Sequence, residues 1–83
     1  MIKVKILGTG CPKCKRLKRT ARSAAREAGV EATFIDVTDI NEIMSYPIAS
    51  TPALVINGRV KSSGRLPSTR EIVGWLEAVS QPD

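Results

Sequence analysis

A strand pattern gives way to a helix pattern within a few residues near the start of this 83-residue chain. In residues 2–7, apolar side chains alternate with Lys3 and Lys5, as in a strand with one buried face. From Pro12, which suits a first helical turn, apolar residues recur at helical spacing until Gly29, which suits a C-terminal cap. Two glycines separate the patterns. We therefore predict a strand followed at once by a long helix.

The next segments predict the continuation of an α/β unit. Residues 31–37 are rich in apolar and β-branched side chains and predict a second strand. Because a helix joins the two strands, they should be parallel. Asp39 with Glu42 has the spacing of a capping box, which predicts a short helix ended by Pro47.

The C-terminal part predicts a hairpin and a last helix. Residues 52–56 are apolar throughout, as in a strand covered on both faces, and Asn57-Gly58 is a strong hairpin signal. Residues 59–62 should therefore form an antiparallel edge strand. Ser68 with Glu71 predicts the start of a final helix that buries Ile72, Leu76 and Val79.

Together these elements predict the order β-α-β-α-β-β-α, an α/β fold in which three helices flank a mixed four-stranded sheet. We expect one domain over residues 1–83. The core should consist of Ile, Val, Leu and Ala, with Phe34 and Trp75 as its large members.

The two cysteines, Cys11 and Cys14, lie two residues apart at the junction between the first strand and the helix. A disulfide between them would constrain very little of the unfolded chain, so a structural cross-link is the weaker interpretation. The pair can instead form and break a disulfide without unfolding anything. We interpret it as a redox-active dithiol.

The charge distribution and the N-terminal segment bear on partners and compartment. Thirteen Lys and Arg against eight Asp and Glu, with no His, give a net charge of +5, and the excess lies in residues 13–26. Such a run is usually a solvated helix face. The alternating first residues are unlike a signal peptide or a membrane span, so we expect a cytoplasmic protein without membrane association. Cytosolic thiols are kept reduced, which favours a catalytic or metal-binding pair over a permanent bridge.

Three motifs together resemble the thioredoxin superfamily: Gly-x-Gly-Cys-Pro-x-Cys at residues 8–14, Ser-Thr-Pro-Ala-Leu-Val at residues 50–55, and Asn57-Gly58. In particular, the chain resembles the small glutaredoxin-like thioredoxins, often called redox-active disulfide proteins. The resemblance covers nearly the whole chain. It implies a thioredoxin-like fold and a thiol:disulfide oxidoreductase that reduces protein disulfides without a metal or organic cofactor.

The resemblance also implies roles for individual residues. Cys11 would be the exposed nucleophile and Cys14 the buried resolving cysteine. Pro52 would be a cis-proline facing the disulfide, and Thr51 would offer its backbone to a bound peptide. The remaining expected site residues are Gly10, Pro12 and Lys13, which would shape the site, and Ile48, Ala49 and Gly64, which would line a substrate groove. Ile48 and Ala49 have an alternative interpretation as core residues that cap the short helix.

The sequence departs from thioredoxins proper at two positions. They carry an aromatic residue directly before the first cysteine, where this chain has Gly10, and a buried aspartate six residues before it, where this chain has Lys5. A lysine on the polar register of a strand is more often solvated than directed toward a site. Tyr46 is interpreted as a packing residue.

The residues also indicate how the dithiol would work. Unpaired N–H groups at the helix N-terminus, a hydrogen bond from the Cys14 thiol and nearby basic residues should all favour the Cys11 thiolate. Cys11 would attack a substrate disulfide, and Cys14 would then resolve the mixed disulfide. We expect protein clients that contain disulfides, a thioredoxin-reductase-like or other thiol reductant, and a monomer. The basic helix face would favour acidic partners.

Two other functions stay open from the sequence. In a metal site, zinc needs four ligands, so only a dimer pooling both cysteine pairs, or a soft ion held by two thiolates, would serve. In a nucleic-acid-binding module, residues 13–26 would contact the backbone, but aromatic platforms are missing, and we do not expect nucleic acid as a partner.

Overall fold

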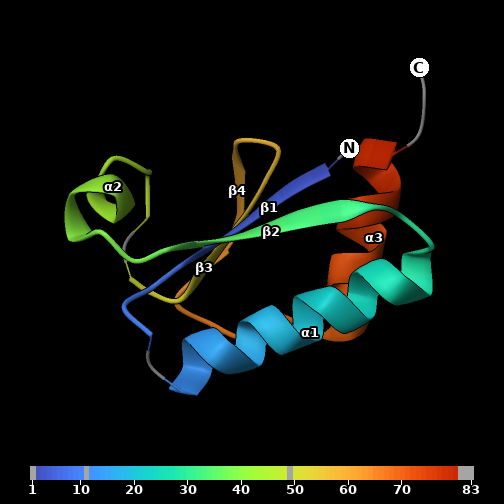
Figure 1. Cartoon of the computed structure of the whole chain (residues 1–83), viewed down its shortest axis with the longest axis horizontal. Coiled ribbons are helices and arrows are strands. Elements are labelled where there is room, and N and C mark those ends of the chain that lie inside the picture. The colour runs from blue at the N-terminus through green and yellow to red at the C-terminus, as the bar shows by residue number, and fades with distance from the viewer. Residues whose placement is uncertain (1, 11, 49, 81–83) are drawn as a thin grey trace.

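The computed structural model describes residues 2–10, 12–48 and 50–80. The elements follow the predicted order (Figure 1): β1 (Ile2–Leu7), α1 (Pro12–Ala28), β2 (Ala32–Val37), α2 (Ile40–Met44), β3 (Ala53–Ile56), β4 (Arg59–Ser63) and α3 (Thr69–Ser80). β2 and β3 each begin one residue later than predicted, and β4 extends one residue further.

The strands form the predicted mixed four-stranded sheet, in the order β2-β1-β3-β4. β1 and β2 are parallel, and the other neighbours are antiparallel. Val4 in the middle of β1 pairs with Phe34 on one side and with Ile56 on the other. A β-bulge interrupts the β3–β4 pairing between Leu54 and Val55, which suits the edge position of β4.

Apolar side chains fill both faces of the sheet. The larger cluster joins β1 and β3 to α1 and α3, through buried residues such as Val4, Leu17, Leu54 and Leu76. The second cluster lies on the α2 face and includes Leu7, Val55 and Ile43. Figure 1 shows α1 and α3 together on one side of the sheet and α2 on the other. All four residues of β3 are buried, as predicted for a strand covered on both faces.

The two largest apolar side chains occupy a different place from the one expected. Phe34 and Trp75 are only half-buried and pack against the edge of the larger cluster. The fully buried side chains are aliphatic, with Leu17, Leu54 and Leu76 among the largest. Phe34 lies in β2, which is an edge strand of the sheet, and the Arg22 guanidinium lies 5.7 Å from the centre of its ring.

Local signals in the sequence set the turn and the caps. Asn57 and Gly58 both have positive φ, 50° and 84°, as a tight two-residue hairpin requires. Asn57 also ties the hairpin to β1: its N–H donates to the Lys3 carbonyl at 2.8 Å, and its Oδ1 accepts from the Lys3 N–H at 2.9 Å. Asp39 caps α2 by accepting from the Asn41 N–H at 2.9 Å.

The predicted capping box of α3 forms only in part. The Ser68 hydroxyl oxygen accepts from the Glu71 N–H at 3.2 Å, as expected. The Glu71 carboxylate accepts from the Arg65 guanidinium at 2.8 Å. That charged hydrogen bond holds the pKa of Glu71 below its ordinary value.

Within the described residues, no helix combines the length and the apolar character that crossing a membrane would need.

Candidate active site

One end of the sheet gathers the predicted site residues. Leu7, the last residue of β1, pairs with Val37 at the end of β2 and with Ala53 at the start of β3. The turn at 8–10, the N-terminus of α1 and the residues before β3 therefore lie at the same edge. This register brings Cys14 and Pro52, which are far apart in sequence, to one end of the molecule. Cys11 and Ala49 lie outside the described residues.

Cys14 lies in the first turn of α1, and its side chain is 6% exposed. It packs directly on Gly8: a Cβ built on Gly8 would overlap the Cys14 Sγ and would lie 3.3 Å from the Cys14 Cβ. The Gly8 N–H donates to the Val37 carbonyl at 3.0 Å, which fixes this position to the sheet. The Cys14 thiol therefore packs against the backbone of Gly8.

In the sequence, Gly8 is recognisable only as one of the two glycines that separate the strand pattern from the helix pattern. Its φ is not in the left-handed region, so the backbone conformation does not require glycine here. The absence of a side chain is required, because Cys14 approaches closely. A glycine directly after a buried strand is a recognised signal of such an approach, and it is the signal that was available in the sequence.

The first two residues of α1 are exposed, and its first turn is free of acidic side chains. Gly10 has a φ of +88° and turns the chain toward the helix. Pro12 and Lys13 are both exposed, and the first turn of α1 contains no Asp or Glu. No acidic side chain of that turn neutralises the partial positive charge of the helix N-terminus, so a negative charge placed at this end would be stabilised.

The segment before β3 contains the cis peptide bond that the resemblance implies, between Thr51 and Pro52. Pro52 is buried and Thr51 is exposed. The Gly64 N–H donates to the Pro52 carbonyl at 2.9 Å, and a Cβ on Gly64 would overlap the Ser50 hydroxyl. Gly64 thus lies against the segment that contains Pro52, although its role in substrate binding remains a prediction.

A small hollow of about 140 Å³ adjoins Thr51. Its lining residues are Ile43, Met44, Ile48, Ser50 and Thr51. Ile48 is half-buried and also packs against the second core cluster, so it belongs both to the core and to the wall of the hollow. Met44 is 74% exposed at the rim, and sequence reasoning assigned it no role beyond the short helix.

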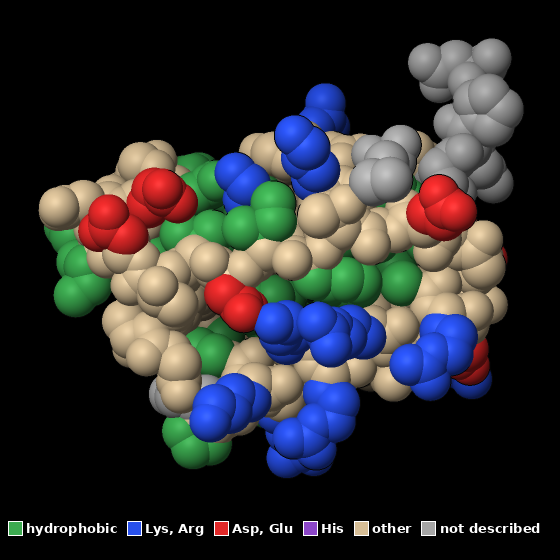
Figure 2. All heavy atoms as spheres, viewed as in Figure 1, with side chains coloured by type: hydrophobic (Ala, Val, Ile, Leu, Met, Phe, Trp, Pro, Cys, Tyr) green, Lys and Arg blue, Asp and Glu red, His purple; other side chains and the backbone are tan. Residues whose placement is uncertain are grey.

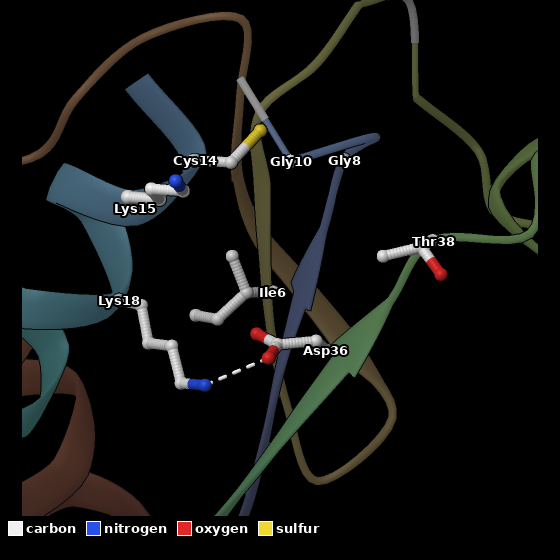
Figure 3. Close-up of a pocket in the computed structure, with 8 residues that line it drawn as sticks. All are labelled: Ile6, Gly8, Gly10, Cys14, Lys15, Lys18, Asp36 and Thr38. Carbon is white, nitrogen blue, oxygen red and sulfur yellow. Dashed lines mark hydrogen bonds and ion pairs between the residues drawn. The ribbon is translucent and has the colours of Figure 1, made fainter. Parts of the chain in front are cut away.

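A second cavity, of about 260 Å³, lies between α1 and β2, and Cys14 is one of its lining residues (Figure 3). It reaches from Gly10 and Cys14 to Asp36, whose carboxylate forms an ion pair with the Lys18 ammonium at 2.7 Å. Figure 3 shows the Cys14 sulfur directed toward the turn at Gly8 and Gly10, with Ile6 between Cys14 and Asp36. Asp36 is therefore engaged by Lys18 and separated from the sulfur by an apolar side chain.

Lys5 is half-buried, contrary to the expectation that it is solvated. Its ammonium donates to the Tyr46 hydroxyl at 3.2 Å and lies 5.9 Å from the centre of the tyrosine ring. Thus the position that carries a buried acid in thioredoxins proper here carries a cation. This cation links β1 to the segment between α2 and β3.

We expect Lys5 and Tyr46 to be energetically coupled. In a double-mutant cycle of Lys5→Met and Tyr46→Leu, the coupling in the free energy of unfolding should be about 1 kcal/mol, as for a half-buried cation that contacts a ring and a hydroxyl. Urea unfolding of the four proteins measures it. A parallel cycle with Lys3→Met, an exposed lysine on the same strand, should give a coupling near zero. Equal couplings in the two cycles would contradict the contact.

Comparison with known proteins shows to which family this chain belongs. Residues 2–77 match the family described as thioredoxin domain. A thioredoxin of Methanothermobacter thermautotrophicus is 36% identical over 72 residues, which cover 87% of this chain and 94% of that protein. The chain belongs to the thioredoxin family. A thioredoxin of Methanocaldococcus jannaschii is also 36% identical, over 78 residues that cover 94% of this chain and 90% of the relative.

The fold agrees with the family. The solved structure of the germline-specific thioredoxin Deadhead from Drosophila melanogaster superimposes with a TM-score of 0.63, over 94% of this chain and 80% of that one, at 19% identity. The predicted thioredoxin-like fold is thereby confirmed. The activity that comes with the family is that of a thiol:disulfide oxidoreductase, which takes disulfide-containing proteins as substrates and a reductant as partner.

Neither alternative function gains support. Among the residues that the structure describes, no group of three or more His, Cys, Asp or Glu side chains is placed to hold a metal ion. The family match and the two relatives are thioredoxins and carry no sign of a nucleic-acid-binding module.

Proposed function

We propose that residues 1–83 form a single thioredoxin-like domain that reduces protein disulfides through a reversible Cys11–Cys14 dithiol. One observation carries the proposal: a buried Cys14 rests on Gly8 in the first turn of α1, at the same sheet end as the cis Thr51–Pro52 bond. A cysteine that is only 6% exposed is poorly accessible to a protein client, so we assign the attack on the client to Cys11.

The reaction then follows from these positions. The Cys11 thiolate, favoured by the helix N-terminus and by Lys13, attacks one sulfur of the client disulfide. A Cys11–client disulfide forms, and the other client sulfur leaves as a thiolate. The Cys14 thiol loses its proton to solvent and attacks Cys11, which releases the second client thiolate. Two electrons have passed to the client, and Cys11 and Cys14 are joined by a disulfide.

The surroundings of Pro52 would receive the client chain. The exposed Thr51 offers its backbone beside the hollow that Ile48 and Met44 line, and Gly64 flanks the same segment. An extended peptide could pair with this backbone and place an apolar side chain in the hollow. We propose Ile48 and Gly64 as groove residues on this basis, and we propose Ala49 from the sequence alone, because it follows Ile48 directly.

We also propose that the protein works in the cytoplasm, as a monomer, with a thioredoxin-reductase-like enzyme or another thiol as its reductant. A site made of two thiols needs only a thiol or dithiol donor to return to the reduced state. A reducing compartment supplies such donors.

A redox titration tests the dithiol proposal. In dithiothreitol buffers, Trp75 fluorescence or alkylation of Cys11 should follow one two-electron transition near or below about −200 mV. Metal content should be measured on the same preparation. Thiols that never close reversibly, or that carry a stoichiometric metal ion, would overturn the proposal and favour the metal site.

A further inference from the structure

We infer that the exposed face of α1 is a docking surface for disulfide proteins whose redox site is ringed by acidic side chains; the inference rests on the proposed function. The surface, called the basic face here, comprises seven residues of α1: Lys13, Lys15, Arg16, Lys18, Arg19, Arg22 and Arg26. Glu27 is the single acidic residue of the helix and lies in its last turn. Figure 2 shows Lys and Arg side chains gathered along the edge of the molecule where α1 runs.

Two side chains of the basic face contact other residues of the molecule. Four others are exposed and can contact a partner. Lys18 is paired with Asp36 at 2.7 Å, and the Arg22 guanidinium lies 5.7 Å from the centre of the Phe34 ring. Lys13, Lys15, Arg16 and Arg19 are exposed, and no ion pair in the described part of the chain involves them. These four cations lie in the half of α1 next to the dithiol.

The distance of each basic side chain from the thiols determines how strongly its charge acts on a partner that docks there. At 1.5 Å per residue, Arg16 lies about 6 Å and Arg19 about 10 Å along the helix axis from Pro12. The Debye length is about 8 Å at physiological ionic strength, so Arg16 lies within it and Arg19 slightly beyond it. Both charges are therefore only partly screened at the sulfur, and Arg16 acts more strongly on a partner docked there. Arg26 lies about 21 Å along the axis and is largely screened there.

The charge distribution favours an acidic protein over a nucleic acid. Nucleic-acid grooves combine cations with exposed aromatic rings on which bases stack. The three aromatic residues, Phe34, Tyr46 and Trp75, are all half-buried, and Arg22 lies over Phe34. Cations beside a thiol instead suit a protein partner, since a complementary charge speeds encounter and orients the reacting disulfide.

A set of disulfide peptides tests the inference. The peptides share one disulfide loop and differ in flanking residues, which are acidic, neutral or basic. At low salt the reduced protein should react with the acidic peptide about tenfold faster than with the neutral one, and the basic peptide should be slowest. The preference should largely vanish at about 0.5 M salt, where the Debye length is about 4 Å.

Two matched variants locate the surface. Arg16→Glu/Arg19→Glu should abolish or reverse the preference for the acidic peptide. Lys3→Glu/Arg59→Glu changes the net charge equally at the opposite end of β1 and should keep the preference. Circular dichroism confirms that both variants are folded. An unchanged preference in the first variant, or an equal loss in both, overturns the inference.

A small uncharged disulfide, hydroxyethyl disulfide, separates this inference from the proposed function. The peptide rates of each protein are divided by its own rate with this compound, because reversing charges near the helix N-terminus also changes how readily Cys11 ionises. If the wild type cannot reduce this compound, the proposed function fails; if it does so but shows no charge preference among the peptides, only the docking surface fails. Salt-sensitive binding of a duplex oligonucleotide that Arg16→Glu/Arg19→Glu abolishes, without a peptide preference, would assign the surface to nucleic acid and likewise overturn the inference.

Discussion

Replacing Cys14 with serine should lower the turnover of protein disulfides by at least about a thousandfold while leaving the first exchange intact. Serine lacks the nucleophilic sulfur that resolves the mixed disulfide, so the client should stay bound to Cys11. Intact-protein mass spectrometry should show the reduced variant gaining the mass of one client chain, and steady-state assays should show the loss of turnover.

The companion variant, Cys11→Ser, should fail at both steps and form no adduct. The contrast follows from the burial of Cys14, whose 6% exposure leaves its sulfur poorly accessible to a protein. If Cys11→Ser formed the adduct and Cys14→Ser did not, the roles of the two cysteines would be exchanged. If both variants kept turnover, the dithiol proposal would be wrong.

The fold was predictable because its signals are local. The alternation in β1, the apolar run of β3 and the Asn57-Gly58 turn each determine one element from its own residues. Once a helix joins β1 to β2, the strands must be parallel, and the hairpin after β3 fixes the remaining edge. The cysteine spacing and the Thr-Pro motif then predicted two halves of a site, and the pairing of Leu7 with Ala53 places Cys14 and Pro52 at one end of the sheet.

Contacts between distant side chains were not predictable in this way. Lys5 meets Tyr46 across 41 positions, and Lys18 meets Asp36 across 18. A lone sequence shows the polarity of such residues but not their partners, so Lys5 was expected in solvent. Phe34 was expected as a large member of the core for a similar reason: its size is visible in the sequence, whereas its place in an edge strand depends on how the strands assemble.

Gly8 is both a local signal in the sequence, at the end of a strand, and a contact point for another side chain in the fold. Gly8→Ala is therefore expected to be one of the most damaging small substitutions in this chain. The added Cβ would overlap the Cys14 Sγ and lie 3.3 Å from the Cys14 Cβ, so rotating the thiol alone does not relieve the clash. The hydrogen bond from Gly8 to Val37 keeps the strand end from retreating. We therefore expect α1 to shift outward at its first turn.

Gly8→Ala should lower both the free energy of unfolding and the rate at which Cys14 resolves the mixed disulfide. Overpacking at this contact should lower the free energy of unfolding by about 1–3 kcal/mol. A displaced Cys14 should resolve the mixed disulfide about tenfold or more slowly, because small errors in the placement of reacting atoms are costly. Urea unfolding measures the first effect, and stopped-flow release of the client thiol measures the second.

Gly74→Ala is the matched control for Gly8→Ala. Gly74 is exposed within α3, and a Cβ there would meet nothing within 4 Å. Because alanine is the better helix former, this variant should be more stable than wild type by about 0.5–1 kcal/mol, with resolution unchanged. A Gly8→Ala protein that matched Gly74→Ala in stability and in the rate of resolution would show that Cys14 does not need the space above Gly8. Slow resolution confined to Gly8→Ala would instead make Gly8 a positioning residue of the dithiol.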